Sequence, residues 1–253
     1  MIIDSPTPSQ IPALRQLWSE AFGDGEEFLD VFFSTAFSPH RCRCITEDGE
    51  VLAALYWFNC VCEGRNIAYL YAIATASSHR GRGLCTALMK DTHDHLKALG
   101  YTGAILVPGE KSLFEFYEKK GYGVFGGMGE LHCSPSADTV NLRRVDSREF
   151  AALRRNLLPR GGVIQEAENL EFLQASAEFY AGDGFLMAAC LDNGSLFAYE
   201  LLGNVSKAPA ILNTLGCAEG RFRISDADTP FAMYLPLSDE SLSPPTYFGF
   251  AFD

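Results

Sequence analysis

Residues 73–86 read Ile73-Ala74-Thr75-Ala76-Ser77-Ser78-His79-Arg80-Gly81-Arg82-Gly83-Leu84-Cys85-Thr86. This stretch joins an apolar run over 66–75, typical of a central strand, to a helical pattern of leucines over 84–99. Gly81 and Gly83 let the backbone turn tightly and approach a ligand without a Cβ in the way. The unpaired N–H groups at a helix start favour an anion, so the stretch predicts a cradle for a pyrophosphate group. The alternative is a turn that needs glycine only for tight packing.

Apolar spacing on either side of this stretch predicts further helices and strands. Before residue 126 these are helices over 11–22, 26–37 and 111–120, and strands over 41–46, 51–62, 101–107 and 122–125. Residues 126–138 have little periodicity and contain Gly, Ser and Pro. We therefore place a domain boundary there, with one domain over 1–132 and a second, smaller α/β lobe over 133–253.

The second lobe has an element order like that of the first. Its predicted elements are helices over 147–158, 167–179 and 209–215, and strands over 185–191, 196–202, 221–224, 231–235 and 246–252. No residue-level repeat accompanies this order, so a duplicated fold is left open. The last strand, 246–252, has no charge on either face, which predicts that it is buried.

The composition restricts the classes of function. The chain has 253 residues, of which 47% are hydrophobic and 21% charged, so it has enough apolar residues for one large or two small cores. Its net charge of −12 argues against a general basic surface for nucleic acid or an anionic membrane. The first residues carry no basic region and no apolar signal core, from which we expect a cytoplasmic protein.

Two cysteine pairs, Cys42-x-Cys44 and Cys60-x-Cys62, suggest a zinc site at first sight. Both pairs fall in strand-like runs, where residues two apart share one face, whereas zinc ribbons place their ligands on turns. We predict that they are small buried side chains and that no metal is bound. His93-x-His95 has rings that diverge on a helix, and we predict that it lies on the surface.

Other nucleotide and hydrolase motifs are absent from the sequence. It contains no G-x-x-x-x-G-K-[ST], G-x-S-x-G or H-E-x-x-H, and a G-x-G-x-x-G fingerprint starting at Gly81 fails at Thr86. Arg80-x-x-Gly83-x-Cys85 instead resembles the acetyl-CoA motif [RQ]-x-x-G-x-[GA] of the GNAT acetyltransferases. About 35 residues on, the run from Phe116 to Tyr122 resembles their second hallmark, F-Y-E-K-x-G-[FY]. The resemblance covers roughly residues 1–130 and is closest to the larger two-lobed members, typified by the enhanced-intracellular-survival acetyltransferases.

The resemblance implies a GNAT fold with a mixed, mostly antiparallel central sheet, and acetyl-CoA as co-substrate. The backbone of Ile73, Ala74 and Thr75 would pair with the pantetheine arm. The amides of the next loop would hold the pyrophosphate; its residues are Arg80, Gly81, Arg82, Gly83, Leu84, Cys85 and Thr86. Tyr117 matches the tyrosine that protonates the departing thiolate in many members; its alternative role is that of a core aromatic.

The sequence departs from the family pattern at the general base. Many members carry a glutamate on the central strand, but Tyr69–Ile73 has no carboxylate, and Glu110 replaces a common asparagine. Glu110, a tyrosine of this strand and the C-terminal carboxylate at Asp253 are the candidates, and we name Asp253 beside Tyr117 as a catalytic residue.

These observations favour an N-acetyltransferase that modifies a primary amine of a small molecule. A non-catalytic CoA-binding protein with the same fold, or a purely structural two-lobed protein, remains as an alternative. We expect no nucleic-acid or membrane partner, and a homo-oligomer is left open.

Overall fold

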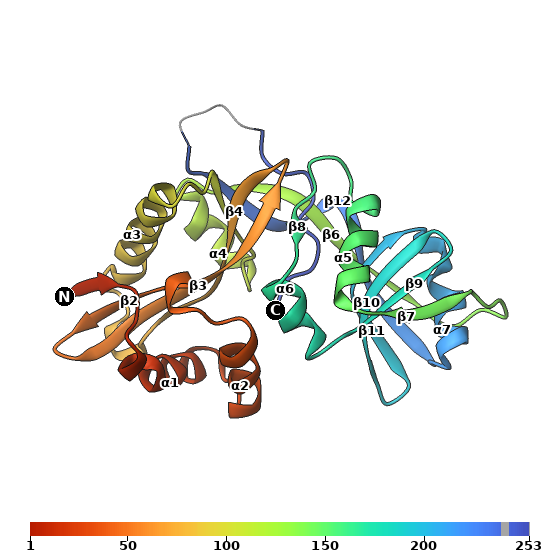
Figure 1. The fold of residues 1–253 in the computed structure, drawn as a ribbon, viewed down its shortest axis with the longest axis horizontal. Coiled ribbons are helices and arrows are strands. Elements are labelled where there is room, and N and C mark those ends of the chain that lie inside the picture. The colour runs from red at the N-terminus through yellow and green to blue at the C-terminus, as the bar shows by residue number, and fades with distance from the viewer. Residues whose placement is uncertain (239–242, 253) are drawn as a thin grey trace. The chain divides into compact units, whose positions relative to one another are not determined.

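The computed structural model describes residues 1–238 and 243–252 (Figure 1). Within it the chain divides into two compact units. The first unit comprises 1–60, 64–106 and 235–242, and the second comprises 61–63, 107–234 and 243–253. Each unit is made of three separate segments of the chain, so no single boundary residue divides them. The boundary between 132 and 133 remains a prediction.

In the first unit, five strands lie side by side in the order β1-β2-β3-β4-β5, and along the chain the helices lie between β1 and β2 and between β4 and β5. Its elements are β1 (Ile2–Asp4), α1 (Ile11–Phe22), α2 (Glu26–Thr35), β2 (Cys42–Glu47), β3 (Glu50–Cys62), β4 (Arg65–Thr75), α3 (Leu84–Ala98) and β5 (Gly103–Leu106). The pairs β1–β2 and β2–β3 are antiparallel, whereas β4 and β5 are parallel.

Helices cover both faces of this sheet. Tyr56 and Trp57 are neighbours on β3 and therefore point to opposite faces. The Tyr56 ring contacts Trp18 of α1 at 5.0 Å and Phe32 of α2 at 5.3 Å between centroids. Trp57 instead packs edge-on against His95 of α3 at 6.1 Å. The first unit thus has three layers, with α1 and α2 on one side and α3 on the other (Figure 1).

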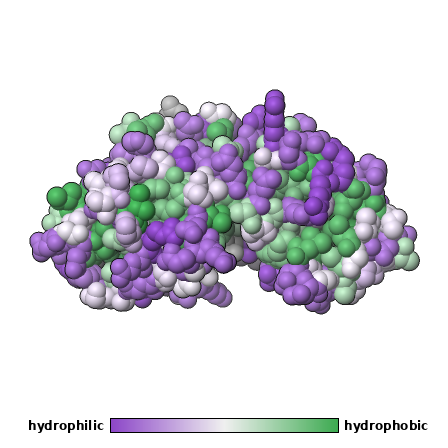
Figure 2. Space-filling model, turned by 60° about the horizontal axis from the view of Figure 1, so that its bottom comes forward, coloured by the Kyte–Doolittle hydropathy of each residue, from purple (hydrophilic) through white to green (hydrophobic). Residues whose placement is uncertain are grey.

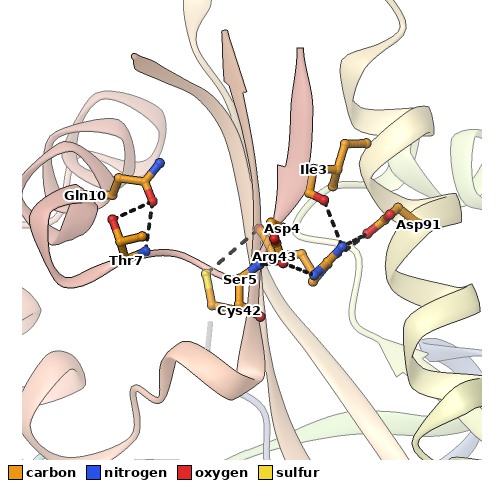
Figure 3. Close-up of polar contacts among 8 residues, drawn as sticks. All are labelled: Ile3, Asp4, Ser5, Thr7, Gln10, Cys42, Arg43 and Asp91. Carbon is orange, nitrogen blue, oxygen red and sulfur yellow. Dashed lines mark hydrogen bonds and ion pairs between the residues drawn. The ribbon is translucent and has the colours of Figure 1, made fainter. Parts of the chain in front are cut away.

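Arg43 of β2 fixes α3 against the edge of the sheet (Figure 3). Arg43 is only 8% exposed, and its guanidinium donates to Asp91 of α3 at 2.8 Å and to Asp4 of β1 at 3.0 Å. A third bond reaches the carbonyl of Ile3 at 3.0 Å. A buried arginine that makes all three of these bonds joins two strands and a helix.

The second unit repeats the topology of the first. Its elements are α4 (Lys111–Glu118), β6 (Gly123–Cys133), β7 (Leu142–Val145), α5 (Ser147–Leu157), β8 (Ile164–Gln165), α6 (Glu168–Gln174), β9 (Glu178–Gly182), β10 (Phe185–Asp192), β11 (Ser195–Gly203), α7 (Ala208–Leu215) and β12 (Glu219–Pro236). From β7 onward the order is strand, two helices, three strands, helix, strand, as it is from β1 to β5, except that the two-residue strand β8 lies between α5 and α6. The strands β7, β9, β10 and β11 pair antiparallel in that order, and β11 pairs parallel with β12.

The predicted α/β fold class is confirmed, and so is the duplicated order of elements. One helix was predicted too long: the pattern over 167–179 ends as α6 at Gln174, and β9 begins at Glu178. The short edge strands β1 and β7 were missed because three or four residues carry little periodicity. The two strands predicted over 221–235 are parts of one long strand, β12.

The C-terminal segment is buried as predicted, but it is not a regular strand. Tyr247, Phe248 and Phe250 are each at most 2% exposed. Only Tyr247 forms a bridge, with Gly162, and Gly249 takes φ = +101°, which ends the extended conformation. The segment is therefore held mainly by side chains of the second unit.

A buried ion pair forms the centre of those contacts. Arg154 of α5 and Glu200 of β11 are 2% and 1% exposed and lie 2.7 Å apart. The Tyr247 hydroxyl donates to Glu200 at 2.9 Å, and Gln165 donates to the carbonyl of Phe250 at 2.8 Å. Burial beside the Glu200 carboxylate raises the pKa of Tyr247 well above its usual value. Each buried charge is thus satisfied, as its desolvation requires.

A substitution at Gly249 tests how strongly the C-terminal segment depends on the Arg154–Glu200 pair. A Cβ at position 249 would lie 2.2 Å from a nitrogen of Arg154 and 2.6 Å from an oxygen of Glu200. We expect Gly249→Ala to lower the free energy of unfolding by roughly 3 kcal/mol or more, measured by urea denaturation followed by circular dichroism.

The matched control is Gly194→Ala, at φ = +81° in the β10–β11 turn with no atom within 4 Å of the added Cβ. It carries only the backbone strain, about 1 kcal/mol. Equal losses for the two variants would show that the tail does not pack on the ion pair.

Candidate active site

The glycine-rich stretch connects the end of β4 to the start of α3. The ladder between β4 and β5 runs from Ile67–Gly103 to Tyr69–Ile105, and β4 then continues to Thr75. Just past the ladder, Ala72 has φ = +47°, a left-handed conformation that is strained for a residue with a Cβ. Ile73, Ala74 and Thr75 follow this irregularity as the last residues of β4, beyond the ladder with β5, and on the other side Ala76 donates its N–H to the carbonyl of Leu52 on β3 at 2.9 Å.

The turn itself has the backbone that the glycines predict. Gly81 and Gly83 have φ = +76° and +77°, and a Cβ on either would meet no protein atom within 4 Å. Gly83 is the residue before the first turn of α3, and Leu84, with 4% exposure, anchors that turn in the core. Cys85 is half-buried and Thr86 exposed. The structure thus brings residues 80–86 together as one surface turn at a helix start.

The two arginines of the turn are held by neighbours in the same unit. Arg80 donates to the carbonyl of Thr75 at 3.3 Å. Arg82 forms an ion pair with Glu47, from the end of β2, at 2.9 Å, and this pair lowers the pKa of Glu47. Both arginines are exposed, so the turn presents positive charge and helix-start amides to solvent in an acidic protein.

A second contact to this loop was not foreseen from the sequence. The N–H of Ser77 donates to the carboxylate of Glu20, on α1, at 2.8 Å. Glu20 and Ser77 are 57 residues apart, and Glu47 and Arg82 are 35 apart. No local pattern reports contacts across such distances, so both acidic partners were missed.

Tyr117 lies in the last turn of α4 and is 8% exposed. The helix stops as its sequence predicts: Gly121 takes φ = +91°, and the N–H of Tyr122 bonds to the carbonyl of Tyr117. The Tyr122 ring packs edge-on against that of Tyr117 at 5.9 Å. Tyr117 belongs to the second unit and residues 73–86 to the first. Its role as an acid remains a prediction.

The candidates for the base have different surroundings. Glu110 is exposed and precedes α4, where it accepts a bond from the hydroxyl of Ser112. Tyr69 of β4 is buried and stacks on Phe58, and Tyr71 is half-buried. Asp253 lies outside the described residues.

The equivalent turn of the second unit has lost the features of a cradle. Between β11 and α7, the side chain of Asn204 accepts bonds from the N–H and the hydroxyl of Ser206. Pro209 removes an N–H from the first turn of α7, and its carbonyl accepts a bond from Ser136. Local groups already use this turn, so it lacks the open glycine turn that the first unit has at residues 80–86.

Neither cysteine pair nor the histidine pair forms a metal site in the described part of the chain, which holds no group of three or more His, Cys, Asp or Glu placed to bind a metal. Cys42, Cys44, Cys60 and Cys62 are buried, as predicted. The prediction that the histidine pair lies on the surface was wrong: His93 and His95 are both half-buried, and His95 packs against Trp57.

Comparison with known proteins identifies a family for the first part of the chain. Residues 3–125 match the family model described as an acetyltransferase (GNAT) domain. No curated protein has a matching sequence. None of the described helices is long and apolar enough to cross a membrane.

Solved structures of similar fold cover both units. A GCN5-related N-acetyltransferase from Kribbella flavida is 18% identical, with a TM-score of 0.70 over 92% of this chain and 70% of its own. Eis1 from Mycobacterium abscessus is 12% identical, with a TM-score of 0.68 over 95% of this chain and 75% of its own. A putative acetyltransferase from Pyrococcus horikoshii is 14% identical, with a TM-score of 0.65 over 98% of this chain and 93% of its own.

The chain therefore contains a GNAT acetyltransferase domain, and its GNAT-type fold extends over two lobes. The resemblance drawn from the two sequence motifs is confirmed.

The half-buried His93 makes the stability of this domain sensitive to pH. Burial lowers the pKa of His93 to about 4, although Asp94 opposes the shift. The pKa of His95 on the same helix is also lowered, mainly by burial. In the unfolded chain a histidine takes up a proton near pH 6.5, whereas folded His93 stays neutral down to about pH 4, so stability falls as the pH drops through this window.

We expect His93→Gln to recover about 2 kcal/mol of the stability that the wild type loses between pH 7 and pH 5. The measurement is urea denaturation at both pH values. The control is His40→Gln, since His40 is exposed. An identical loss in the wild type and the His93 variant would contradict the assignment.

Proposed function

We propose that the protein is an N-acetyltransferase that moves an acetyl group from acetyl-CoA to a primary amine of a small molecule. The observation that carries the proposal is the surface turn over residues 80–86. It combines two left-handed glycines, a helix start and two arginines directly after a strand that leaves its parallel partner. This combination suits a pyrophosphate joined to an extended arm.

Different residues of the first unit would bind different parts of acetyl-CoA. The amides of 80–86 would take the pyrophosphate, and Arg80 and Arg82 would add positive charge. The backbone of Ile73, Ala74 and Thr75 would pair with the pantetheine arm, because these residues lie past the end of the ladder with β5. No metal enters this scheme.

The chemistry needs one acid and one base. The amine nitrogen attacks the carbonyl carbon of the thioester, the carbon–sulfur bond breaks, and the sulfur leaves as a thiolate. We assign the proton that neutralises the thiolate to the hydroxyl of Tyr117, and the proton lost by the amine to a base among Glu110, a tyrosine of β4 and the C-terminal carboxylate.

The acceptor and the setting of the reaction are also proposals. The net charge of −12 favours a cationic small molecule over an anionic polymer, in line with an amine acceptor and no nucleic-acid or membrane partner. We propose a cytoplasmic location. The surface in Figure 2 is a mosaic of hydrophilic and hydrophobic side chains, and the large exposed hydrophobic residues, such as Phe22, Leu99 and Leu191, are scattered over the chain.

Gly83 provides the test of the cradle. We expect Gly83→Val to weaken the binding of acetyl-CoA at least tenfold, because a branched residue resists the left-handed backbone and its side chain occupies the ligand's approach. Isothermal titration calorimetry measures the affinity, and wild-type protein should bind one acetyl-CoA per chain.

Gly64→Val is the matched control, because Gly64 has nearly the same φ, +76°, and equally open space, but lies in the β3–β4 turn. It should cost similar stability and leave the affinity within about twofold. Equal affinity of the wild type and the Gly83 variant would place the ligand elsewhere.

Tyr117 provides the test of catalysis. We expect Tyr117→Phe to lower kcat about 100-fold and to change the KM for acetyl-CoA by less than about threefold, because the variant loses the proton donor and keeps the ring. The assay follows free thiol released from acetyl-CoA in the presence of a panel of amines.

Tyr122→Phe, a buried neighbour of Tyr117, should keep the wild-type kcat. Normal turnover by Tyr117→Phe would remove the acid assignment. Binding of acetyl-CoA without thiol release by any amine would favour the non-catalytic alternative, and the absence of binding would favour a structural protein.

A further inference from the structure

The loop before residues 80–86 begins with a short turn whose own residues provide no side-chain acceptor for its first N–H groups. Residues Ser77–His79 form a single 3-10 turn, and the residue before it is Ala76, whose methyl group accepts no hydrogen bond. The first N–H groups of such a turn need an acceptor from outside it. In this protein the carboxylate of Glu20 supplies it from another helix, at 2.8 Å from the N–H of Ser77.

Glu20 is committed to this contact. Hydrogen bonds from the hydroxyl and the N–H of Ser77, in that order, are the main causes that lower the pKa of Glu20. Two backbone bonds connect this turn to the next residues: the N–H of His79 donates to the carbonyl of Ala76, and the N–H of Arg80 donates to that of Ser77. The direction in which residues 80–83 leave the turn therefore depends on how its first residue is held.

The charge of Glu20 has the wrong sign for a direct role in holding an anion. Arg80 and His79 lie near enough to lower its pKa further, so the carboxylate is close to the positive end of the cradle. A carboxylate there repels a phosphate group and partly neutralises the arginine. Its position is explained by the bond to the loop, and that bond needs only an acceptor oxygen.

The loop is also held by the hydrogen bond from Arg80 to the carbonyl of Thr75 and by the ion pair of Arg82 with Glu47, and such surface contacts are individually weak in water. Gly81, Arg82 and Gly83 are exposed, and neither glycine has an atom near the position of a Cβ. A loop ordered before the ligand arrives loses less conformational entropy on binding, and so binds more tightly. α1 is a suitable support because Leu14, Leu17 and Trp18 fix it in the core.

We propose that Glu20 is a positioning residue of the acetyl-CoA site: it caps the turn at Ser77 from α1 and so holds the cradle loop in the conformation that receives the pyrophosphate. This proposal rests on the proposed function, since it assigns that loop to acetyl-CoA.

Two substitutions at position 20 separate the hydrogen bond from the charge. Glu20→Gln keeps an acceptor oxygen without the charge, whereas Glu20→Ala removes both. We expect Glu20→Ala to raise the Kd and the KM for acetyl-CoA about fivefold to tenfold, with kcat changed less than about twofold. Glu20→Gln should stay within about twofold of the wild type in Kd, KM and kcat. Gln16→Ala, an exposed position one turn earlier on α1, should behave as the wild type.

Hydrogen exchange of the free protein gives a reading that does not depend on acetyl-CoA. The amides of residues 77–83 should exchange several-fold faster in Glu20→Ala than in the wild type, Glu20→Gln and Gln16→Ala, with the same melting temperature in all four.

Unchanged exchange and unchanged affinity in Glu20→Ala would overturn the capping role. Glu20→Gln as weak as Glu20→Ala would overturn the hydrogen-bond explanation in favour of charge. Faster loop exchange in Glu20→Ala, together with wild-type protein that binds no acetyl-CoA, would refute the proposed function and the assignment to that site while leaving the cap itself shown.

Discussion

The parallel pairing of β4 with β5 is the constraint on which the rest of the first unit depends. Parallel strands cannot be joined by a hairpin, so the chain must leave β4, cross the sheet as α3 and return. That crossover puts a helix start at the end of the strand, where its N–H groups face solvent. Strand, turn and helix are therefore set by one topological requirement, and the glycines make the turn short enough to satisfy it.

The second unit also contains a parallel pair of strands joined by a helix, but its turn before the helix is different. Its β11–α7–β12 crossover has the same parallel pairing, but Asn204 and Pro209 occupy the turn that would otherwise offer free amides. Its central strand carries Glu200, neutralised by Arg154 and covered by the C-terminal segment. Removing either charge would leave the other buried and unpaired, so this pair must stay complete beside the hydrophobic core of the second unit.

The first unit shows how an acidic chain can present positive charge at one turn. Among the described residues, the arginines of the cradle are each engaged by an oxygen of the same unit: Arg80 by the carbonyl of Thr75 and Arg82 by Glu47. Their charge is held in place by surface contacts that are individually weak in water. At this turn the local field of the arginines and the helix start favours an anion, although the net charge of the whole chain favours a cation.

The sequence by itself determined the periodic elements, the glycine turn before α3 and the helix that stops at Gly121, because each depends on residues within a few positions. It also indicated the family, since both motifs are local. Only the tertiary structure decided the strain at Ala72, the partners of Ser77 and Arg82, and the buried pair of Arg154 with Glu200. It also decided that 246–252 is held by side chains and not by a strand ladder. The hydrogen bonds and ion pairs among these features join residues 35 to 57 positions apart, and no local pattern of side chains encodes such contacts. The backbone at Ala72 and over 246–252 is set by the elements packed around it.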